Sequence, residues 1–271
     1  MTFELILEDA KLMANISSII SSIVSESIMR ISKEGISIKA YDTQKISLID
    51  FFMKSSAFEK YEVKEPMEVG LSLEMLNTIL KTAGANESLK LTFDNEEKRF
   101  VIEFLSSKRR RRFALSLISI EEEEGVPESI SLEFDVNFQV KASFIQQVIK
   151  DAELIEEHMT ISANAEGITF SASGDTNEMK TFIHPESDEI DTESFVVNAE
   201  STADYSLELL SNFLKGIRSS DYVQISFSSE KPIKITYFLD DKGHLIYLVA
   251  PRMEDYEVEE YEDYEDYEED M

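Results

Sequence analysis

The sequence predicts an α+β protein built from two copies of one domain, and two observations support this. The stretch EGISIKAYDTQ, which begins at Glu34, reappears as EGITFSASGDT from Glu166, about half a chain later. Around both stretches the apolar residues follow the same order of patterns: a helix, several strands, a second helix and several more strands. One large domain would leave this repetition unexplained, so duplication is the more economical interpretation.

The first half starts with a helix pattern from about Ala10 to Val24, in which apolar residues recur every three to four positions. A strand then leads into the Glu-Gly-Ile hairpin, where Gly35 suits a turn with positive φ. A strand over 47–53 follows, and then a helix pattern over 72–84 that ends at a glycine. The closing strands are SLKLTFD, RFVIEFL and RRFALSLI.

The second half repeats these patterns in the same order. A helix is expected over 142–152, the matching hairpin glycine is Gly167, and EMKTFI (178–183) is expected to be a strand. A further helix pattern covers SLELLSNFLKGIRSS (206–220). The closing strands are YVQISFS, IKITYFL and HLIYLVA.

Two charged segments mark the boundaries of these halves. ISIEEEEGVPESISLEF joins four consecutive glutamates to a Gly-Val-Pro sequence, which is typical of an exposed linker. From Glu254 onward the chain carries twelve acidic residues and no basic ones, and such a self-repelling block is expected to be disordered. The expected divisions are an N-terminal domain (1–118), a connecting loop (119–133), a C-terminal domain (134–254) and an acidic tail (255–271).

The composition excludes several kinds of chemistry. The chain has no cysteine and only three scattered histidines, so we expect no disulfide, no metal site and no cofactor. Phosphate-binding glycine loops and the common hydrolase motifs are absent from the sequence, and we expect no enzymatic activity. The start of the chain lacks the features of a signal peptide and no apolar run is long enough to span a bilayer, so we expect an intracellular protein.

The net charge of −29 bears on nucleic-acid binding. The acidic segment from Glu254 accounts for −12, and an acidic body argues against the densely basic surface of an ordinary nucleic-acid-binding protein. The polar faces of the four helix patterns are nevertheless poor in acidic residues. They are either ordinary solvated faces or one mildly basic wall that contacts phosphates, for which the candidates are Lys11, Lys81, Lys150, Lys215 and Arg218.

The densest basic run is KRRRR at 108–112, where two strand patterns of the first half meet. Its simplest interpretation is a charged hairpin that protects a sheet edge. The functional alternatives are a phosphate contact, for which Arg109 is the candidate, and a complement to acidic groups on another protein.

Several segments resemble the PCNA sliding clamps of archaea and eukaryotes. HLIYLVAPRMED (244–255) resembles the C-terminal segment of that family, and ITFSASGD (168–175) resembles its second-domain hairpin. SLEMLNTILKTAG, the YDTQKISLIDF region and the Gly-Val-Pro of the linker show the same resemblance. Order and spacing match along nearly the whole chain, so the segments together are a specific signal.

The resemblance implies a trimeric ring of six similar domains, in which helices line a central channel and antiparallel sheets lie outside. Such a clamp encircles double-stranded DNA without reading its sequence. It tethers DNA polymerase, flap endonuclease and DNA ligase through their PIP-box peptides, and a clamp loader places it on DNA. A closed ring needs only sparse phosphate contacts, so the acidic body does not exclude a DNA partner.

The resemblance also assigns roles to individual positions. Edge strands of adjacent subunits would pair through Arg110, Arg112, Ala114 and Leu117 on one side and Asn177, Met179, Thr181 and Ile183 on the other. The peptide-docking pocket corresponds to Ile46, Leu48, Val126, Pro127, Pro232, Leu248, Ala250, Pro251 and Met253. Leu248 replaces an aromatic residue common in the family, and the linker glutamates replace a more hydrophobic stretch, while the acidic tail has no counterpart.

Three other functions stay open at this point. The chain could be one subunit of a heterotrimeric clamp, which depends on how its edges match those of related chains. It could be a carboxylate-dependent hydrolase with a duplicated fold, which would require acidic residues clustered in a pocket. It could also be a protein-interaction scaffold that never binds DNA.

Overall fold

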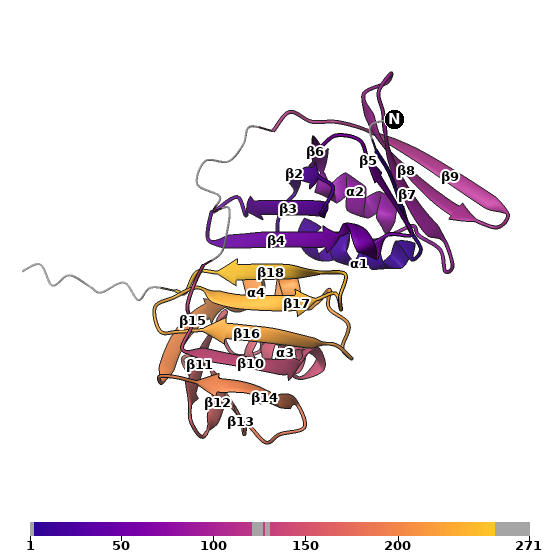
Figure 1. Cartoon of the computed structure of the whole chain (residues 1–271). Helices are drawn as coiled ribbons and strands as arrows, with labels where there is room; N and C mark the ends of the chain where they lie inside the picture. Colours follow the sequence, from indigo (N-terminus) through magenta and orange to yellow (C-terminus); the bar gives the residue numbers. More distant parts are fainter. Residues whose placement is uncertain (1–2, 121–126, 128–130, 253–271) are drawn as a thin grey trace, which may run out of the picture.

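The computed structural model describes residues 3–120, 127 and 131–252 (Figure 1). The elements of the first half are β1 (Phe3–Leu7), α1 (Ala10–Ser21), β2 (Glu26–Ile31), β3 (Gly35–Tyr41), β4 (Ser47–Lys54), the short 3₁₀ helix η1 (Ser55–Ala57), β5 (Lys60–Val63), β6 (Met67–Ser72), α2 (Leu73–Leu80), β7 (Ser88–Asp94), β8 (Arg99–Ser106) and β9 (Arg109–Ser116). Those of the second half are β10 (Val136–Lys141), α3 (Ala142–Ala152), β11 (His158–Asn164), β12 (Gly167–Ser173), β13 (Glu178–Ile183), β14 (Ile190–Val197), β15 (Ser201–Ser206), α4 (Leu207–Leu214), β16 (Tyr222–Phe227), β17 (Ile233–Phe238) and β18 (Gly243–Val249).

The two halves repeat one order of elements, as the duplicated sequence predicts. β1, α1 and β2–β6 correspond to β10, α3 and β11–β15, and α2 with β7–β9 corresponds to α4 with β16–β18. Strand pairing aligns them residue by residue: Leu5 lies opposite Leu91 in the first half, and Phe138 lies opposite Ile225 in the second. All four side chains are buried, so corresponding strand positions form the core in both halves.

Three of the four helices are shorter than their sequence patterns, whereas α3 has the predicted bounds. α1 ends before Ser22, whose Oγ donates to the Ile19 carbonyl at 2.7 Å. α2 ends in a similar way at Leu80, because Thr82 Oγ1 donates to the Ile79 carbonyl at 2.7 Å. In both cases a hydroxyl group satisfies a carbonyl of the last turn, so the chain can leave the helix without an unpaired acceptor.

The hairpin glycines have the positive φ that the sequence predicts, +159° at Gly35 and +153° at Gly167. Each also lies directly against the neighbouring strand. A Cβ atom would come within 2.1 Å of the Met53 carbonyl oxygen at Gly35 and within 2.3 Å of the Ile183 carbonyl oxygen at Gly167. The repeated glycine is therefore required by close backbone approach, and it has no chemical role.

A nine-stranded antiparallel sheet runs through both halves, in the order β14-β10-β16-β17-β18-β4-β3-β2-β6. The halves meet where β18 pairs with β4, in an uninterrupted register from Gly243 opposite Met53 to Val249 opposite Ser47. Along this joint the Tyr247 side chain is fully buried. Main-chain hydrogen bonds thus join the two halves where β4 and β18 lie side by side (Figure 1).

Two smaller sheets complete the outer layer, with the orders β5-β1-β7-β8-β9 and β13-β12-β11-β15. By the correspondence of the halves, the five-stranded sheet matches β14-β10-β16-β17-β18 and the four-stranded sheet matches β4-β3-β2-β6. The sets β14-β10-β16-β17-β18 and β4-β3-β2-β6 are joined within the nine-stranded sheet. The two smaller sheets are not joined to each other and lie at opposite ends of the molecule (Figure 1). Within the described residues, β9 and β13 therefore each end a sheet with an unpaired edge.

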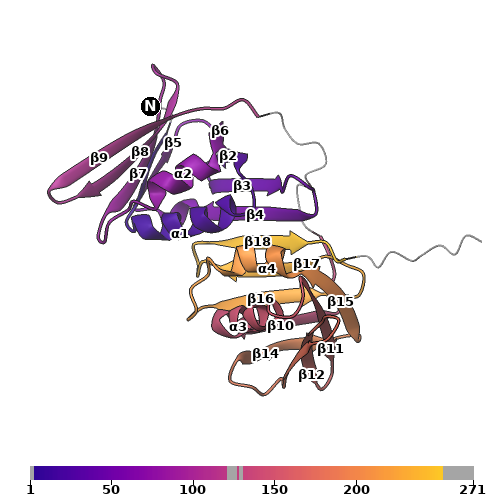
Figure 2. The ribbon, with the colours of Figure 1, turned by 180° about the vertical axis from the view of Figure 1, so that it is seen from behind.

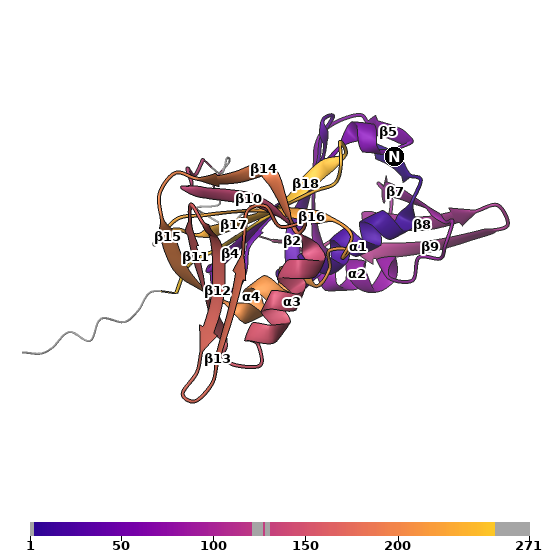
Figure 3. The ribbon, with the colours of Figure 1, turned by 90° about the horizontal axis from the view of Figure 1, so that it is seen from below.

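The four helices lie together on one face of the sheets, as the view from behind and the view from below show (Figures 2 and 3). α1 packs on α2, α3 packs on α4, and α1 touches α4 across the joint between the halves. At that crossing the Ser22 hydroxyl donates to the Asn212 carbonyl at 3.1 Å. Among the described residues, none of the helices is both long and apolar enough to cross a lipid bilayer.

Candidate functional site

The helical face carries the five cations that the sequence indicates. Lys11, Lys81, Lys150, Lys215 and Arg218 are all exposed, and they come from α1 and from the ends or flanks of the other three helices. Two of them have acidic neighbours: Lys215 Nζ lies 3.7 Å from Glu153, and Arg218 Nε lies 3.0 Å from Asp221. The other three make no ion pair with the described residues, so they are available to an external anion.

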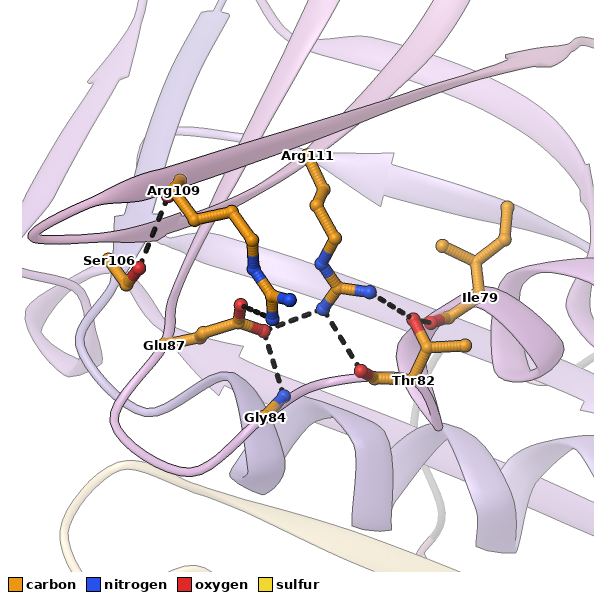
Figure 4. Close-up of polar contacts among 7 residues, drawn as sticks. All are labelled: Ile79, Thr82, Gly84, Glu87, Ser106, Arg109 and Arg111. Carbon is orange, nitrogen blue, oxygen red and sulfur yellow. Dashed lines mark hydrogen bonds and ion pairs between the residues drawn. The ribbon is translucent and has the colours of Figure 1, made fainter.

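Arg109 is engaged elsewhere, in a cluster around the carboxylate of Glu87 (Figure 4). Glu87 is buried and accepts hydrogen bonds from Arg109 Nη2 at 2.8 Å, Arg111 Nη2 at 2.6 Å and the Gly84 backbone N–H at 2.8 Å. The Arg109 hydrogen bond, followed by that of Gly84, lowers the pKa of Glu87 to about 2. Arg109 thus compensates a carboxylate of its own chain, while 62% of its side chain stays exposed, so its role as a phosphate contact stays a prediction.

Arg111 connects this cluster to α2. Its Nη1 donates to Thr82 Oγ1 at 3.0 Å and its Nη2 donates to the Thr82 carbonyl at 2.9 Å, while the guanidinium lies 4.5 Å from the centre of the Phe104 ring. A planar guanidinium suits this combination of carboxylate, carbonyl and aromatic neighbours. The cluster therefore fixes strand β9 to the end of α2.

The opposite face of β9 is neutralised in the same way. Arg110 Nε donates to the buried Glu103 at 2.8 Å, and Arg112 Nη2 lies 3.5 Å from Asp94. The four arginines therefore lie along the strand and not in the turn before it, and each meets an acidic residue of its own chain. Of the interpretations of KRRRR, the charged sheet edge agrees best with this geometry.

The predicted subunit-contact residues lie at two separate edges. Ala114 is on β9, and Leu117 follows the end of that strand, whereas Met179, Thr181 and Ile183 are on β13. Asn177 immediately precedes β13. Within one chain these two sets do not meet, because β9 and β13 belong to different sheets.

Both edges are flanked by apolar surface that the sequence does not indicate. Beside β9, a groove is lined by Ser72, Met75, Ile79, Phe113, Ala114, Leu115 and Ser116. Beyond the end of α3, the Leu154 side chain is 82% exposed, and Phe182 on β13 is also exposed. Leu154 lies outside the periodic part of its helix pattern, so only the correspondence with α1 could have drawn attention to it.

Six of the predicted pocket residues come together at one end of the β4–β18 joint. Leu48 lies opposite Leu248, and the Ala250 N–H donates to the Ile46 carbonyl at 2.9 Å. Leu48 and Leu248 are buried, whereas Ile46 is 39% exposed and so offers apolar surface. Pro251 follows this contact, and Pro232 precedes β17, whose first residue pairs with the end of β18.

The remaining pocket positions are less informative. Pro127 is exposed. Val126 and Met253 lie outside the described residues, as do the linker glutamates and the acidic tail.

The described residues contain no cluster of histidine and acidic side chains that could hold a metal ion. The histidines are also far apart in the fold, at the starts of β11 and β18 and just after β13. His244 packs against the Phe52 ring, with a distance of 6.0 Å between ring centres, and burial lowers its pKa. These contacts give His244 a packed structural setting beside β4.

Comparison with known proteins agrees with this architecture. Residues 2–125 match the family described as proliferating cell nuclear antigen, N-terminal domain, and residues 125–252 match its C-terminal domain. The chain is 33% identical over 257 residues to the DNA polymerase sliding clamp of Pyrococcus abyssi, covering 94% of this chain and 100% of that one. It is also 33% identical over 260 residues to the proliferating cell nuclear antigen of Dictyostelium discoideum, covering 93% and 100%.

A solved structure extends this likeness to three dimensions. The crystal structure of PCNA from Thermococcus kodakaraensis superposes with a TM-score of 0.87 at 25% sequence identity, and the match covers 93% of this chain and 100% of that one. Both halves of the chain and their relative placement are included in this match.

Proposed function

The chain belongs to the proliferating cell nuclear antigen family of DNA polymerase sliding clamps, and from this premise we propose that it forms a ring that encircles duplex DNA. The observation that carries the proposal is the joint between β18 and β4. At this joint the five-stranded set β14-β10-β16-β17-β18 and the four-stranded set β4-β3-β2-β6 form one sheet. The two smaller sheets have the same strand orders, and in them β9 corresponds to β18 and β13 corresponds to β4. Both β9 and β13 are free edges.

Transferring the register of the internal joint gives a definite contact between subunits. In the internal joint, Tyr247 of β18 lies opposite Ile49 of β4. Phe113 of β9 corresponds to Tyr247, and Met179 of β13 corresponds to Ile49. We therefore expect Phe113 to lie opposite Met179 of the next subunit. Ala114 then lies opposite Glu178, on the other face of the new sheet. The inward-facing pair is apolar, as a buried joint requires.

The helices support the same closure. Ser22 and Asn212 touch across the internal joint. Leu154 is the residue that corresponds to Ser22, and Thr78 is the residue that corresponds to Asn212. In the ring, Leu154 would therefore reach α2 of the next subunit near Thr78, beside the apolar groove of Met75 and Ile79. An exposed leucine and an apolar groove would cover one another, which explains why a monomer leaves both open.

Three such joints would close a ring with every helix facing inward. The free cations Lys11, Lys81 and Lys150 would then point into the channel and contact phosphates without reading bases. The acidic body does not prevent this, because topological enclosure replaces strong binding. We further propose boundaries at 1–118, 119–133, 134–254 and 255–271, because β9 ends at Ser116 and β10 begins at Val136.

As a clamp the protein would act inside the cell as a processivity factor, with no reaction of its own. Replication and repair proteins such as polymerase, flap endonuclease and ligase would bind through PIP-box peptides at the exposed Ile46 and the adjacent Pro251. Replacing Ile46 by aspartate should weaken such a peptide by at least about tenfold, since a buried apolar anchor contributes roughly 1.5–3 kcal/mol. An unchanged peptide affinity in calorimetry would remove Ile46 from the pocket.

The decisive test of the clamp is topological. Protein loaded on a nicked circular DNA should remain bound at high salt and should be released when a nuclease linearises the circle. Retention on the linear product would contradict encirclement. The native mass of this chain expressed alone distinguishes a homotrimer from one subunit of a heterotrimer.

A further inference from the structure

The last described residue, Arg252, is held at the margin of the helical face. Its backbone N–H donates to the Asp204 carbonyl of β15 at 2.8 Å, and its Nη1 lies 3.4 Å from His158 Nδ1 at the start of β11. β15 ends at Ser206, α4 begins at the next residue, and the strand packs against this helix. The acidic segment that follows, residues 254–270, is therefore attached beside the N-terminal end of α4.

The acidic segment needs cations that its own sequence does not supply. It carries twelve acidic residues and no basic ones, with four tyrosines among them. The rest of the chain is also acidic, with a net charge of −17. Binding of the segment is therefore favoured only where exposed cations gather and lack acidic partners of their own.

The helical face is such a place. Lys11, Lys81 and Lys150 are exposed there and make no ion pair with the described residues. The arginines of β9 form the other dense group of cations, but each of them already meets an acidic residue of this chain. The charge of the acidic segment thus fits the helical face better than the β9 edge.

Acidic residues on the same face limit where the segment can lie. A pocket of about 480 Å³ has both His158 and Lys215 in its lining, and it is also lined by Glu153, Glu156, Glu157 and Glu208. These four carboxylates repel an acidic segment, so its contacts must begin beyond this pocket, toward Lys150 on α3 and the helices of the first half.

The length of the segment allows this. Seventeen residues span about 20–25 Å as a random coil and at most about 60 Å when extended, and like charges favour the longer forms. α4, with eight residues, is only about 12 Å long. A segment attached beside the start of α4 can therefore pass the pocket and continue along the helical face.

We propose that residues 254–270 bind the helical face of their own assembly through Lys11, Lys81 and Lys150, and that duplex DNA has to displace them. The second part rests on the proposed function, whereas the first does not. Contacts between exposed charges are individually weak and are screened by salt. Attachment to the same chain compensates for this weakness, because it gives the segment a millimolar effective concentration at the face.

The test measures how fast an amine-reactive reagent labels each lysine, with mass spectrometry as the readout. It compares the full-length wild type with a full-length variant in which the eight glutamates of the segment are glutamine. A site of millimolar affinity would be about half occupied, so Lys11, Lys81 and Lys150 should be labelled about twofold faster in the variant at low salt. Near 1 M salt the two proteins should be labelled equally.

Two other lysines are internal controls. Lys33, in the β2–β3 turn, should be labelled equally in both proteins, and so should Lys45, which precedes the exposed Ile46. Faster labelling of Lys45 in place of the helical lysines would show that the segment occupies the predicted peptide pocket, and would overturn the proposal. Equal labelling of every lysine, or a uniform increase that includes Lys33, would overturn it as well.

The competition with DNA is measured on the same two proteins. A short duplex, followed by fluorescence anisotropy at low salt, should bind the glutamine variant about twofold more tightly, because the face is no longer half occupied. An unchanged duplex affinity would overturn the competition. The labelling experiment uses no DNA, so failure of the clamp proposal would be recognised separately in the release of protein from a linearised circle.

Discussion

Leu154 offers the sharpest test of ring closure, because the side chain is 82% exposed in the single chain and should be covered in the ring. Replacing it by alanine removes apolar surface from the joint without touching the core of the subunit. Loss of most of a leucine side chain from a buried site costs about 1.5 kcal/mol per joint. Three joints break when a trimer separates into subunits, which amounts to about 4.5 kcal/mol per ring.

This loss has a large effect on assembly. A change of about 4.5 kcal/mol raises the trimer dissociation constant roughly 1,500-fold, and since that constant scales with the square of concentration, the midpoint of dissociation rises about 40-fold. Sedimentation or mass photometry over a dilution series would measure this shift. Val196→Ala is the matched control, because Val196 is 43% exposed but lies on β14, away from the expected joints.

Two results would refute this reasoning. An unchanged midpoint for Leu154→Ala would show that the side chain stays exposed in the assembly, so the α3–α2 contact inferred from Ser22 and Asn212 would be wrong. An equal shift for Val196→Ala would show that the effect is not specific to the joint. The Tm of the isolated subunit should be the same for all three proteins.

Three further predictions test the joint, the Glu87 cluster and the channel. In this cysteine-free chain, Ala114→Cys with Glu178→Cys should form disulfide-linked oligomers on oxidation, because directly opposed residues have the spacing a disulfide needs; equal cross-linking of Ala114→Cys with Lys180→Cys would contradict the register. The pKa of Glu87 is lowered from an ordinary value of 4.5 to about 2, so its contribution to stability is complete above pH 4.5 and is lost as the pH falls toward 2. Tm should therefore fall less steeply with decreasing pH in Glu87→Gln than in the wild type. Parallel curves of Tm against pH would exclude this linkage. The double variant Lys11→Ala with Lys81→Ala should reduce the magnitude of the slope of log affinity against log salt concentration for duplex DNA by about 1.8. The control Lys33→Ala, in the β2–β3 turn, should leave this slope unchanged. An unaltered slope in the double variant would place Lys11 and Lys81 outside the DNA contact.

The duplicated fold could be predicted from sequence because the repeat and the apolar periods are local signals. The Glu-Gly-Ile hairpins, the four helices and the closing strands all appear in the predicted order. Helix ends were less predictable, since Ser22 and Thr82 end α1 and α2 through side-chain hydrogen bonds that apolar periodicity does not detect.

The exposure of Lys11 and Lys81 could be predicted, because both lie on the polar side of a helix pattern, whereas their contact with DNA stays a prediction. The site was not predictable where partners come from distant parts of the sequence. The acceptor of Arg109 is Glu87, on a different loop, so the sequence alone does not reveal that the arginines of this basic run are paired with acidic residues of the same chain. The pairing of Gln146 with the end of α4 and the exposure of Leu154 likewise depend on packing between elements.

The β4–β18 joint also decides where the proposed ring can break. Its seven residue pairs join two halves of one polypeptide, so separating them would still leave the halves tethered through the chain. The β9–β13 joints have no such tether, although their geometry is expected to be the same. The proposed ring would have six nearly equivalent joints, three within chains and three between chains. Only the three joints between chains can separate completely, so a protein that opens the ring for DNA must act on β9 or β13.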